Sequence, residues 1–377
     1  MADLGGITPA VAAWPPNIVD VRIIGHVADA DNIRFARGIG RSFSFAGARF
    51  YMFGDTYCTA EDGHLLRIVS NSTAVVCHQN TPCFTYYPRF GYDRTVNALI
   101  EMTEDEENLW NNHGIRVAFW PYGGVLETDP EAGWTWYEKH EVHRRDTGNE
   151  ALYCGTGIAQ VVLDDPENRP EDRNTIISDE TRLYAREVAQ VVVNSTPRDL
   201  YTIRHDDLLF TRNEPRFGGF PAILEGEFIY LFGYHRIGVF LARVPKNVPW
   251  LRSAYTFWNG VNYVTELGEG IPVLRDLRDG SINKSRFFGA AKPWTLVGRS
   301  ESQDNIVMAG TSESLEGPWE LTEICEARGF DDPNSQVNCI SPHHWALEAA
   351  DGELLVTWSE DWPGEVVAAR LTFEMGE

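Results

Sequence analysis

The alternation of apolar and polar positions is clearest between residues 37 and 58, RGIGRSFSFAGARFYMFGDTYC. Two short alternating runs, residues 40–45 and 48–55, lie on either side of the dipeptide Ala46-Gly47. Such alternation predicts half-buried strands, and a short connection that contains glycine predicts that the strands form a hairpin. Similar apolar runs that end on polar or aromatic residues recur at residues 115–124, 228–236, 305–312 and 353–361. A hairpin that recurs at intervals of roughly 50–75 residues predicts a β-propeller, in which each repeat forms one blade.

The number of blades follows from the candidate inner strands. Six segments have the character of an inner strand, near positions 40, 96, 152, 217, 287 and 343. Their mean spacing is about 60 residues, which is close to the length of one four-stranded blade. We therefore expect an all-β, single-domain propeller of about six blades, with five as the alternative. It is expected to span residues 21–377, after an N-terminal arm at residues 1–20.

Three further segments carry specific expectations. Residues 21–27 are expected to form the first strand and to pair with the last blade, which would close the ring. Residues 103–108, TEDEEN, are expected to form a solvated acidic loop. Residues 182–193 fit either a helix or a strand, because a helix-compatible beginning is followed by three consecutive valines.

The composition limits the classes of ligand. Aromatic residues make up 12% of the chain and include 12 tryptophans, which suits carbohydrates or flat hydrophobic ligands. The formal net charge of −23 argues against nucleic acids and anionic membrane surfaces, because both require basic patches. No glycine-rich loop follows a strand and opens a helix, and no Cys/His spacing is typical of zinc. We therefore expect no cofactor, no metal ion and no nucleic-acid partner.

Sequons and cysteines indicate the secretory pathway. Candidate glycosylation sites are Asn71, Asn194 and Asn283. The six cysteines suggest at least two disulfides, with the pairing open and with two local candidates, Cys77–Cys83 and Cys325–Cys339. The N-terminus lacks the basic and apolar regions of an intact signal peptide, and no apolar run reaches the roughly 18 residues that span a bilayer. A secreted, disulfide-bonded glycoprotein without a membrane span is expected.

Candidate functional residues lie at strand ends, because these line the central funnel of a propeller, where ligands usually bind. Asp is disfavoured inside strands, so Asp55 either caps a turn or presents its carboxylate to a ligand. Arg216 either pairs with Glu214, which faces the same side of an extended segment, or reaches into the funnel. His343 and His344 point to opposite faces, so at most one of them faces the funnel as an acid, base or hydrogen-bond donor.

The other candidates occupy comparable positions in the remaining blades. Tyr234 joins Asp55, Arg216 and the two histidines as a candidate catalytic residue. The candidate substrate-binding residues are Arg37, Thr56, Trp120, Tyr122, Phe217, His235, Lys292, Trp294, Trp345, Trp358 and Glu360. Each aromatic residue among them could instead belong to the core.

The first hairpin resembles endo-D-arabinanase-like glycosidases through Arg37-Gly38 and the motif Phe-Gly-Asp-Thr at residues 53–56. Members of that family typically carry Arg-Asp-Gly in the inner strand ahead of Phe-Gly-Asp-Thr, which supplies two carboxylates. Here Gly38 follows Arg37 directly, so the first carboxylate is missing unless Asp31 replaces it. The resemblance implies a propeller that hydrolyses glycosides, whereas the missing carboxylate argues against hydrolysis, which needs a carboxyl pair.

Over more of the chain, the sequence resembles secreted fungal proteins that include hetero-Diels–Alderases of tropolone-sesquiterpenoid pathways. The segments that carry this resemblance are residues 153–159, 214–220, 240–246, 315–319, 341–346 and 357–366. The resemblance implies that a tropolone quinone methide and a humulene-type alkene are held together in the funnel. Orientation of the reactants and a donor to the quinone carbonyl would then supply the rate, without an acid–base pair.

The leading hypothesis is therefore a secreted fungal enzyme that joins hydrophobic small molecules by an intermolecular hetero-Diels–Alder reaction. The alternative is an arabinanase-like glycoside hydrolase or polysaccharide lyase acting on oligosaccharides. A third hypothesis is a non-catalytic glycan-binding propeller. The lining of the funnel separates the first two, because a sugar site should carry several carboxylates and a terpene site mostly aromatic side chains.

Overall fold

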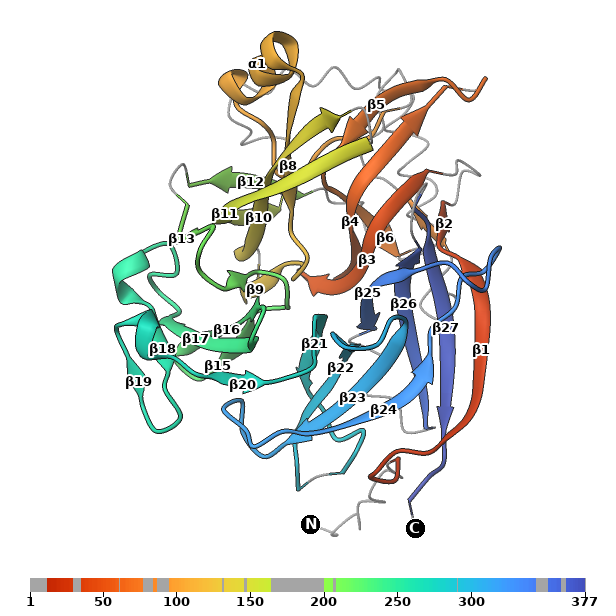
Figure 1. Cartoon of the computed structure of the whole chain (residues 1–377), viewed down its shortest axis with the longest axis vertical. Helices are drawn as coiled ribbons and strands as arrows, with labels where there is room; N and C mark the ends of the chain where they lie inside the picture. Colours follow the sequence, from red (N-terminus) through yellow and green to blue (C-terminus); the bar gives the residue numbers. More distant parts are fainter. Residues whose placement is uncertain are drawn as a thin grey trace, which may run out of the picture.

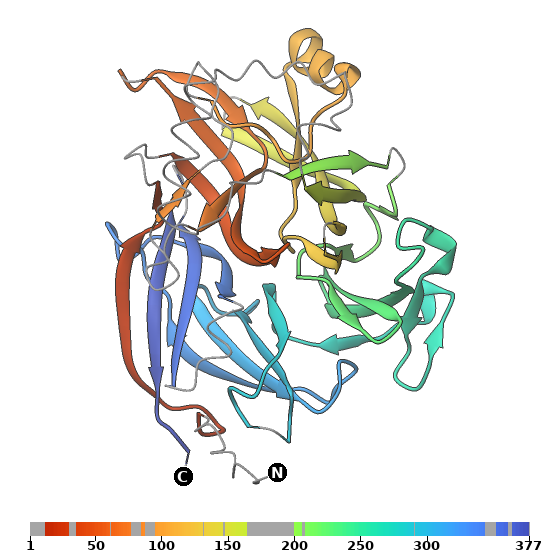
Figure 2. The ribbon, with the colours of Figure 1, turned by 180° about the vertical axis from the view of Figure 1, so that it is seen from behind.

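The computed structural model describes residues 12–29, 35–60, 62–76, 84–86, 95–130, 132–145, 148–163, 200–205, 208–289, 291–343, 352–360 and 364–376. These residues form five sheets, which follow one another around a ring in the order of the chain (Figures 1 and 2). The architecture is the β-propeller that the recurring hairpin predicts. Within the described ranges, no helix combines the length and the apolar character needed to cross a bilayer.

The first three sheets are formed by the first two thirds of the chain. The first sheet contains β2 (Ala28–Asp29), β3 (Ala36–Phe45), β4 (Ala48–Thr59), β5 (Leu65–Val69), β6 (Ser72–Val76) and β7 (Phe84–Tyr86). The second contains β8 (Ile115–Trp120), β9 (Leu126–Asp129), β10 (Ala132–Arg145), β11 (Gly148–Leu163), β12 (Leu200–Arg204) and β13 (Phe210–Thr211). The third contains β14 (Arg216–Phe217), β15 (Ile223–Glu225), β16 (Phe228–His235), β17 (Gly238–Pro245), β18 (Thr256–Trp258), β19 (Tyr263–Val264) and β20 (Pro272–Leu274).

The last two sheets have four strands each. The fourth contains β21 (Asp279–Lys284), β22 (Trp294–Arg299), β23 (Ile306–Ser312) and β24 (Glu320–Glu326). The fifth contains β25 (Val337–Pro342), β26 (Glu353–Glu360), β27 (Val366–Phe373) and, from the beginning of the chain, β1 (Ile18–His26). The helical elements are α1 (Glu104–His113), η1 (Arg252–Ala254) and η2 (Leu267–Glu269).

The ring is closed by β1, as expected for the predicted strand at residues 21–27. Strand β1 pairs antiparallel with β27, from Ile18 opposite Phe373 to His26 opposite Val367. An isolated bridge between Ala12 and Met375 extends this contact. The two ends of the chain thereby complete one sheet, so closure depends on backbone hydrogen bonds rather than on a covalent link.

Five sheets, rather than six, account for the described residues. Three of the six candidate inner strands do not occupy that position. The segment at residues 96–102 forms no named strand, residue 152 lies in β11, the third strand of the second sheet, and residue 287 lies in a turn between β21 and β22. The inner place in the second sheet is taken by β8 and β9, which both pair with β10. The alternative of five blades agrees with this arrangement.

Helix α1 corrects the prediction of an acidic loop at residues 103–108. Thr103 caps the helix, because its side chain accepts a hydrogen bond from the Glu106 backbone while the Glu106 carboxylate bonds the Thr103 backbone. Gly114 ends the helix with φ of 65°, a left-handed conformation that glycine adopts readily. Burial disfavours the charged form of Glu106, but hydrogen bonds from Lys139 and Arg204 outweigh it and lower the pKa of this carboxyl. Capping and ion pairing therefore turn the acidic run into a helix.

The apolar core is divided into wedges between neighbouring sheets. Each of the five hydrophobic clusters joins two adjacent sheets, for example Phe43 of β3 with Phe119 of β8 in one cluster and Trp136 of β10 with Leu231 of β16 in another. The same holds for the clusters that join the third to the fourth, the fourth to the fifth and the fifth to the first sheet. Because the sheets are held together by their faces, the ends of their inner strands remain available to line the centre of the ring.

Candidate functional site

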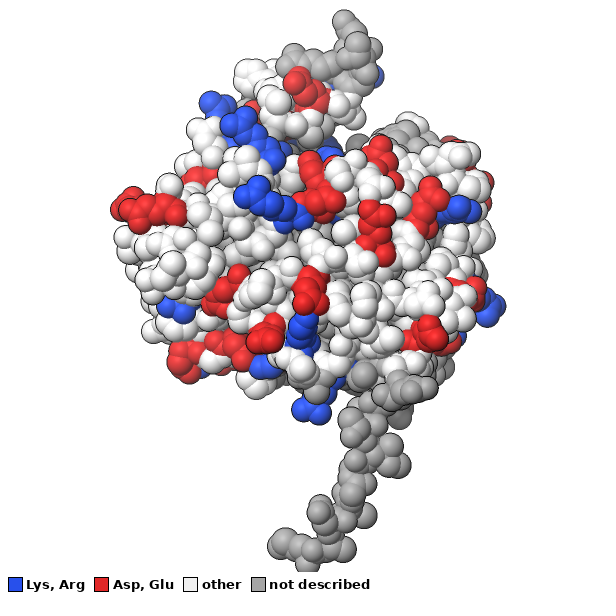
Figure 3. Space-filling model, turned by 60° about the horizontal axis from the view of Figure 1, so that its bottom comes forward, with Lys and Arg blue, Asp and Glu red and all other residues white. Residues whose placement is uncertain are grey.

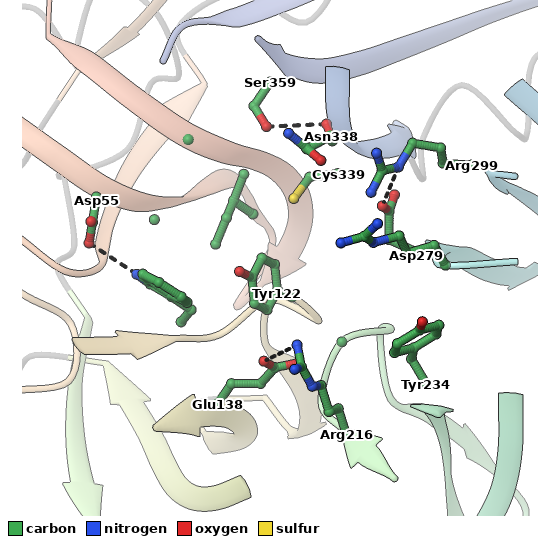
Figure 4. A pocket seen from close by; sticks show the side chains of 16 residues that line it. Asp55, Tyr122, Glu138, Arg216, Tyr234, Asp279, Arg299, Asn338, Cys339 and Ser359 are labelled. Atoms are coloured by element: carbon green, nitrogen blue, oxygen red, sulfur yellow. Dashed lines mark hydrogen bonds and ion pairs between the residues drawn. The ribbon is translucent and has the colours of Figure 1, made fainter. Parts of the chain in front are cut away.

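A cavity of about 450 Å³ lies where strand ends from all five sheets converge (Figure 4). One charged or polar side chain from each sheet illustrates the convergence: Asp55, Glu138, Arg216, Asp279 and Cys339. Central cavities of this size are typical of small-molecule and sugar sites. We take this cavity as the candidate functional site.

Asp55 stands at the wall between the first and second sheets. Both of its oxygens accept hydrogen bonds from Arg116 of β8, at 2.9 and 2.5 Å. The indole nitrogen of Trp120 donates a third hydrogen bond at 3.0 Å. Both oxygens are thus committed, and Asp55 fixes the orientation of Trp120 at the cavity wall.

Glu138 differs from Asp55 because one of its oxygens is available. It lies opposite Trp120 in the register of β10 and β8, and it is only 4% exposed. Its Oε2 contacts His140 Nε2 at 2.9 Å and Arg216 Nη1 at 3.8 Å. Its Oε1 has no hydrogen-bond partner among the described residues. A buried carboxylate with a free oxygen at a cavity wall is suited to proton transfer or to binding a ligand hydroxyl.

Asp279 is the third carboxylate of the cavity, and it begins the inner strand of the fourth sheet. Arg299 Nε donates to its Oδ2 at 2.9 Å, and the backbone N–H of Ile340 donates to its Oδ1 at 3.0 Å. Arg299 is itself fixed by a 2.9 Å hydrogen bond to the Val337 carbonyl of the fifth sheet. The carboxylate is therefore held rigidly across the boundary between two sheets.

Two arginines and a tyrosine form the wall contributed by the third and fourth sheets. Arg216 and Tyr234 lie directly opposite each other on β14 and β16, so their side chains share one face of the sheet. The Tyr234 hydroxyl donates to Glu301 at 2.8 Å. Burial and this contact with Glu301 raise the pKa of Tyr234, and the positive charges of Arg278 and Arg216 oppose the shift. Both arginines therefore lie near this phenol.

Cys339 reaches the cavity through a bulge in β25. The pairing of β25 with β26 shifts between Asn338 and Ser341, and Cys339 between them has φ of 56°. Cys339 and Cys325 are free thiols, which corrects the predicted disulfide between them. The physical reason is their position, since Cys325 lies on β24, at the outer edge of the fourth sheet, and Cys339 on an inner strand of the fifth. Burial raises the pKa of each thiol to about 12, so both stay protonated at neutral pH.

Five of the residues singled out from the sequence line this cavity: Asp55, Trp120, Tyr122, Arg216 and Tyr234. They come from three different sheets, so the structure brings together side chains up to 179 positions apart in the chain, from Asp55 to Tyr234 (234 − 55). Arg216 does not pair with Glu214, whose carboxylate instead binds Arg252 at 2.7 Å. Of the two alternatives for Arg216, the structure agrees with the one that places it in the funnel.

His343, a predicted catalytic candidate, does not line the cavity. It is fully buried, and its Nε2 shares a hydrogen bond with the Tyr51 hydroxyl at 3.1 Å. It follows the far end of β25, four residues beyond Cys339, or roughly 13 Å along an extended strand. His344 and Trp345 lie outside the described residues.

The other predicted binding residues fall into the core or onto other surfaces. Arg37, Thr56, Phe217, Trp294 and Trp358 are buried in the interior and do not line the cavity. Arg37, for example, pairs with Asp29 at 2.8 Å and stacks its guanidinium on the Phe53 ring. Lys292 pairs with Glu320 of the outermost strand β24. His235 packs against Phe240 beside the cavity wall rather than in it.

Glu360 belongs to a different cluster. Its Oε2 lies 3.4 Å from His26 Nε2, and Glu365 Oε2 lies 2.8 Å from His26 Nδ1. In the described part of the chain, these three side chains are the one group close enough together to share a metal ion. Each ring nitrogen already faces a carboxylate, so a protonated imidazole would satisfy the cluster as well.

The structure describes two of the three candidate glycosylation sites. The Asn71 side chain is fully buried, and it bonds the backbone of Ile100 in both directions, so a glycan cannot be attached there in the folded protein. Asn283 is half-buried on β21, and Asn194 lies outside the described residues. Secretion and glycosylation at the other two sites remain predictions.

Glu138, Asp279 and Arg278 line the cavity but were missed by the sequence analysis. A signal for two of them was present, because residues 278–280 read Arg-Asp-Gly, the tripeptide sought in the first blade. In the structure Asp279 and Gly280 begin the inner strand of the fourth sheet, and Arg278 immediately precedes it. Glu138 shares its side of β10 with Trp134 and Trp136, and a carboxylate on an apolar strand face is itself a recognisable signal.

No protein-family model matches the chain. No curated protein matches it either. Among solved structures, a candidate hydrolase from Bacteroides ovatus aligns over 94% of this chain and 94% of its own, with a TM-score of 0.52 and 13% identity. A GH43 enzyme from Xanthomonas citri in complex with xylotriose aligns over 93% of this chain and 90% of its own, with a TM-score of 0.46 and 10% identity. A GH43 β-1,3-galactosidase with galactodeoxynojirimycin aligns over 94% and 95%, with a TM-score of 0.47 and 9% identity. At 13% identity, the similarity to the first of these structures concerns the fold alone, and the chemistry has to be argued from the cavity.

Proposed function

We propose that the protein cleaves glycosidic bonds of an oligosaccharide bound in the central cavity. The observation that supports this proposal is the convergence of three carboxylates from three sheets, one of which, Glu138, keeps an oxygen without a partner among the described residues. Glycoside hydrolysis commonly uses two carboxyl groups that flank the scissile bond, one of them to transfer a proton. The cavity meets this chemical requirement, although Gly38 removes the carboxylate expected in the first blade.

Glu138 is the residue suited to proton transfer. Its Oε1 is available to the glycosidic oxygen, while contacts with His140 and Arg216 hold the other oxygen in place. Asp279 is suited to act as the second carboxylate. Each of its oxygens accepts one hydrogen bond, so each keeps a lone pair with which to direct a water molecule or to stabilise positive charge on the sugar ring.

Asp55 has a positioning role in this scheme. Its three hydrogen bonds hold Arg116 and Trp120, and the Trp120 ring lies 6.2 Å from the Tyr122 ring in an edge-to-face arrangement. Aromatic faces at a cavity wall provide flat apolar surfaces against which a sugar ring packs. Asp55 therefore acts on the substrate through Trp120, and not by transferring a proton.

A hetero-Diels–Alder reaction fits this cavity less well. A site for two hydrophobic reactants should be mostly aromatic, whereas three carboxylates and three guanidinium groups accompany Trp120, Tyr122 and Tyr234 here. Desolvating this many charges against apolar reactants would be unfavourable. The comparisons with known proteins lend the cyclase hypothesis no support, and the glycosidase alternative is the better match to the lining.

The test is a panel of aryl glycosides and plant, bacterial and fungal oligosaccharides, incubated with the full chain and with a Glu138→Gln variant. Cleavage by the unmodified protein should fall at least about 100-fold in Glu138→Gln, as expected for loss of a proton-transfer group. Glu141→Gln is the matched control, because Glu141 lies on the same strand and its side chain is 41% exposed. Absence of cleavage across the panel, or full activity in Glu138→Gln, would overturn the proposal.

A further inference from the structure

The charges that line the cavity do not cancel one another. Three acidic and three basic side chains line it, namely Asp55, Glu138, Asp279, Arg216, Arg278 and Arg299. Asp55 is already paired with Arg116, a residue of the supporting wall, which leaves two carboxylates for three guanidinium groups. Asp279 pairs with Arg299, and Glu138 faces Arg216. One positive charge is therefore left over.

Arg278 carries this surplus charge. Its backbone N–H donates to the Arg299 carbonyl at 3.0 Å, which fixes the residue at the start of β21. Its guanidinium, in contrast, has no hydrogen bond or ion pair with any described residue, although the residue lines the cavity. An exposed guanidinium with a fixed backbone has five donors ready for a ligand.

Arg216 lies opposite Tyr234 in the pairing of β14 with β16 and adds a second cation to this wall. Its Nη1 is 3.8 Å from Glu138 Oε2, which is longer than a hydrogen bond, and its guanidinium lies 4.8 Å above the Tyr153 ring. The side chain is 44% exposed. Several of its N–H donors are thus also uncommitted. In Figure 4, the guanidinium of Arg216 points toward the carboxylate of Glu138 at the cavity.

We infer that Arg278 and Arg216 form a subsite for the carboxylate of an acidic sugar, so that the substrate is a glycan containing uronic acid residues. The inference rests on the proposed function for the sugar, and for the anion on the unpaired guanidinium of Arg278 and on the donors of Arg216 that its contact with Glu138 leaves uncommitted. Guanidinium groups bind carboxylates through paired N–H···O hydrogen bonds, which are stronger than neutral ones. The Tyr234 hydroxyl already donates to Glu301, so its ring and the lone pairs of its oxygen are left to contact the sugar.

The charge of the remaining surface favours binding of an anion at Arg278 and Arg216 over binding elsewhere on the protein. The chain has a formal net charge of −23, and Figure 3 shows acidic side chains spread over the face that it presents, with basic ones among them. A generally acidic surface disfavours unspecific binding of anions. An anionic glycan would therefore be retained at the cavity rather than elsewhere on the surface.

The test measures binding, not cleavage, on the full-length Glu138→Gln protein. The probes are methyl glycosides in matched pairs, glucuronide with glucoside and galacturonide with galactoside, measured by saturation-transfer NMR and calorimetry at low and high salt. The uronide of at least one pair should bind about tenfold or more tightly than its neutral partner, and salt should weaken only the uronide. Adding Arg278→Gln should abolish the difference, whereas Arg275→Gln, an exposed arginine three residues earlier, should preserve it.

The outcomes separate this inference from the proposed function. The acidic subsite would be overturned by equal affinity within every pair, by no binding of any uronide, or by a preference that survives Arg278→Gln. Each of these results counts against the subsite even if neutral glycans are cleaved. A preference for uronides that depends on Arg278, in a protein that cleaves no glycan, would uphold the subsite and overturn the hydrolase. Inorganic sulfate is the further probe, because equally tight, Arg278-dependent binding of sulfate would show a general anion site and contradict recognition of a sugar acid.

Discussion

The carboxylate of Asp55 and the guanidinium of Arg116 face each other in a two-point ion pair, with N–O distances of 2.9 and 2.5 Å. The pair joins β4 of the first sheet to β8 of the second, at the edge of the central cavity. Both side chains are largely shielded from water, at 16% and 17% exposure. A paired geometry of this kind is rigid and directional. It therefore fixes both a boundary between blades and the wall of the site.

Removing Arg116 should destabilise the protein. Arg116→Ala leaves the Asp55 carboxylate partly buried without its main partner, and we expect the free energy of unfolding to fall by about 1–3 kcal/mol. Urea denaturation measures this change. Arg328→Ala is the control, because the Arg328–Glu326 pair is mostly exposed and should contribute less than about 1 kcal/mol. Equal losses in the two variants would contradict a special role for the Asp55–Arg116 pair.

Tyr51→Phe tests whether His343 is structural. The substitution removes the hydroxyl that shares a hydrogen bond with His343 in the core, so the free energy of unfolding should fall by about 1–3 kcal/mol. Turnover of any glycoside that the protein cleaves should remain unchanged, because neither residue reaches the cavity. Tyr230→Phe is the matched control, since the Tyr230 hydroxyl has no hydrogen bond to the described residues. A loss of turnover without a loss of stability would return His343 to the catalytic candidates.

The cap of helix α1 gives a third prediction. Thr103→Ala removes the side-chain oxygen that accepts from the Glu106 backbone, and stability should fall by about 1 kcal/mol. Thr103→Ser keeps this oxygen and should retain most of the stability. Thermal and urea denaturation compare the two variants. If alanine and serine behave alike, the capping box does not stabilise the helix.

The thiol of Cys339 should be unreactive despite its place at the cavity. Burial raises its pKa to about 12, and nearby Asp279 adds to the shift. The folded state therefore favours the neutral thiol over the thiolate. The resulting contribution to the free energy of unfolding is fully present below the ordinary cysteine pKa and is lost as the pH rises toward 12. At pH 7.5, the thiolate fraction is roughly a thousandfold below that of a free cysteine.

Labelling with iodoacetamide followed by peptide mass spectrometry measures the reactivity of Cys339. Alkylation in native buffer should be far slower than after unfolding in urea, and Cys339→Ser identifies the corresponding peptide. Alkylation of folded Cys339 at the rate seen in urea would show that the thiol is not protected. The same experiment on Cys325, whose pKa burial also raises to about 12, should give the same protection.

Sequence patterns predicted the fold because its signals are local. Alternation within residues 40–45 and 48–55 specifies a hairpin without knowledge of any other part of the chain, and recurrence of the hairpin specifies a propeller. Residues 103–108 show the limit of a local reading based on charge alone. The Thr-x-x-Glu pattern that begins the helix is also present in these residues, and it is the signal that a reading based on charge passes over.

The sequence by itself therefore determined the β-propeller, the pairing of its two ends and several strand ends that reach the centre, among them Asp55, Trp120 and Arg216. Only the tertiary structure decided which polar side chains face one another. A bulge of one residue changes the face of every later side chain, so the bulge in β25 directs Cys339 into the cavity, and the far end of the strand buries His343. Likewise, Glu138 and Asp279 lie on different sheets, and their meeting at one cavity depends on closure of the whole ring.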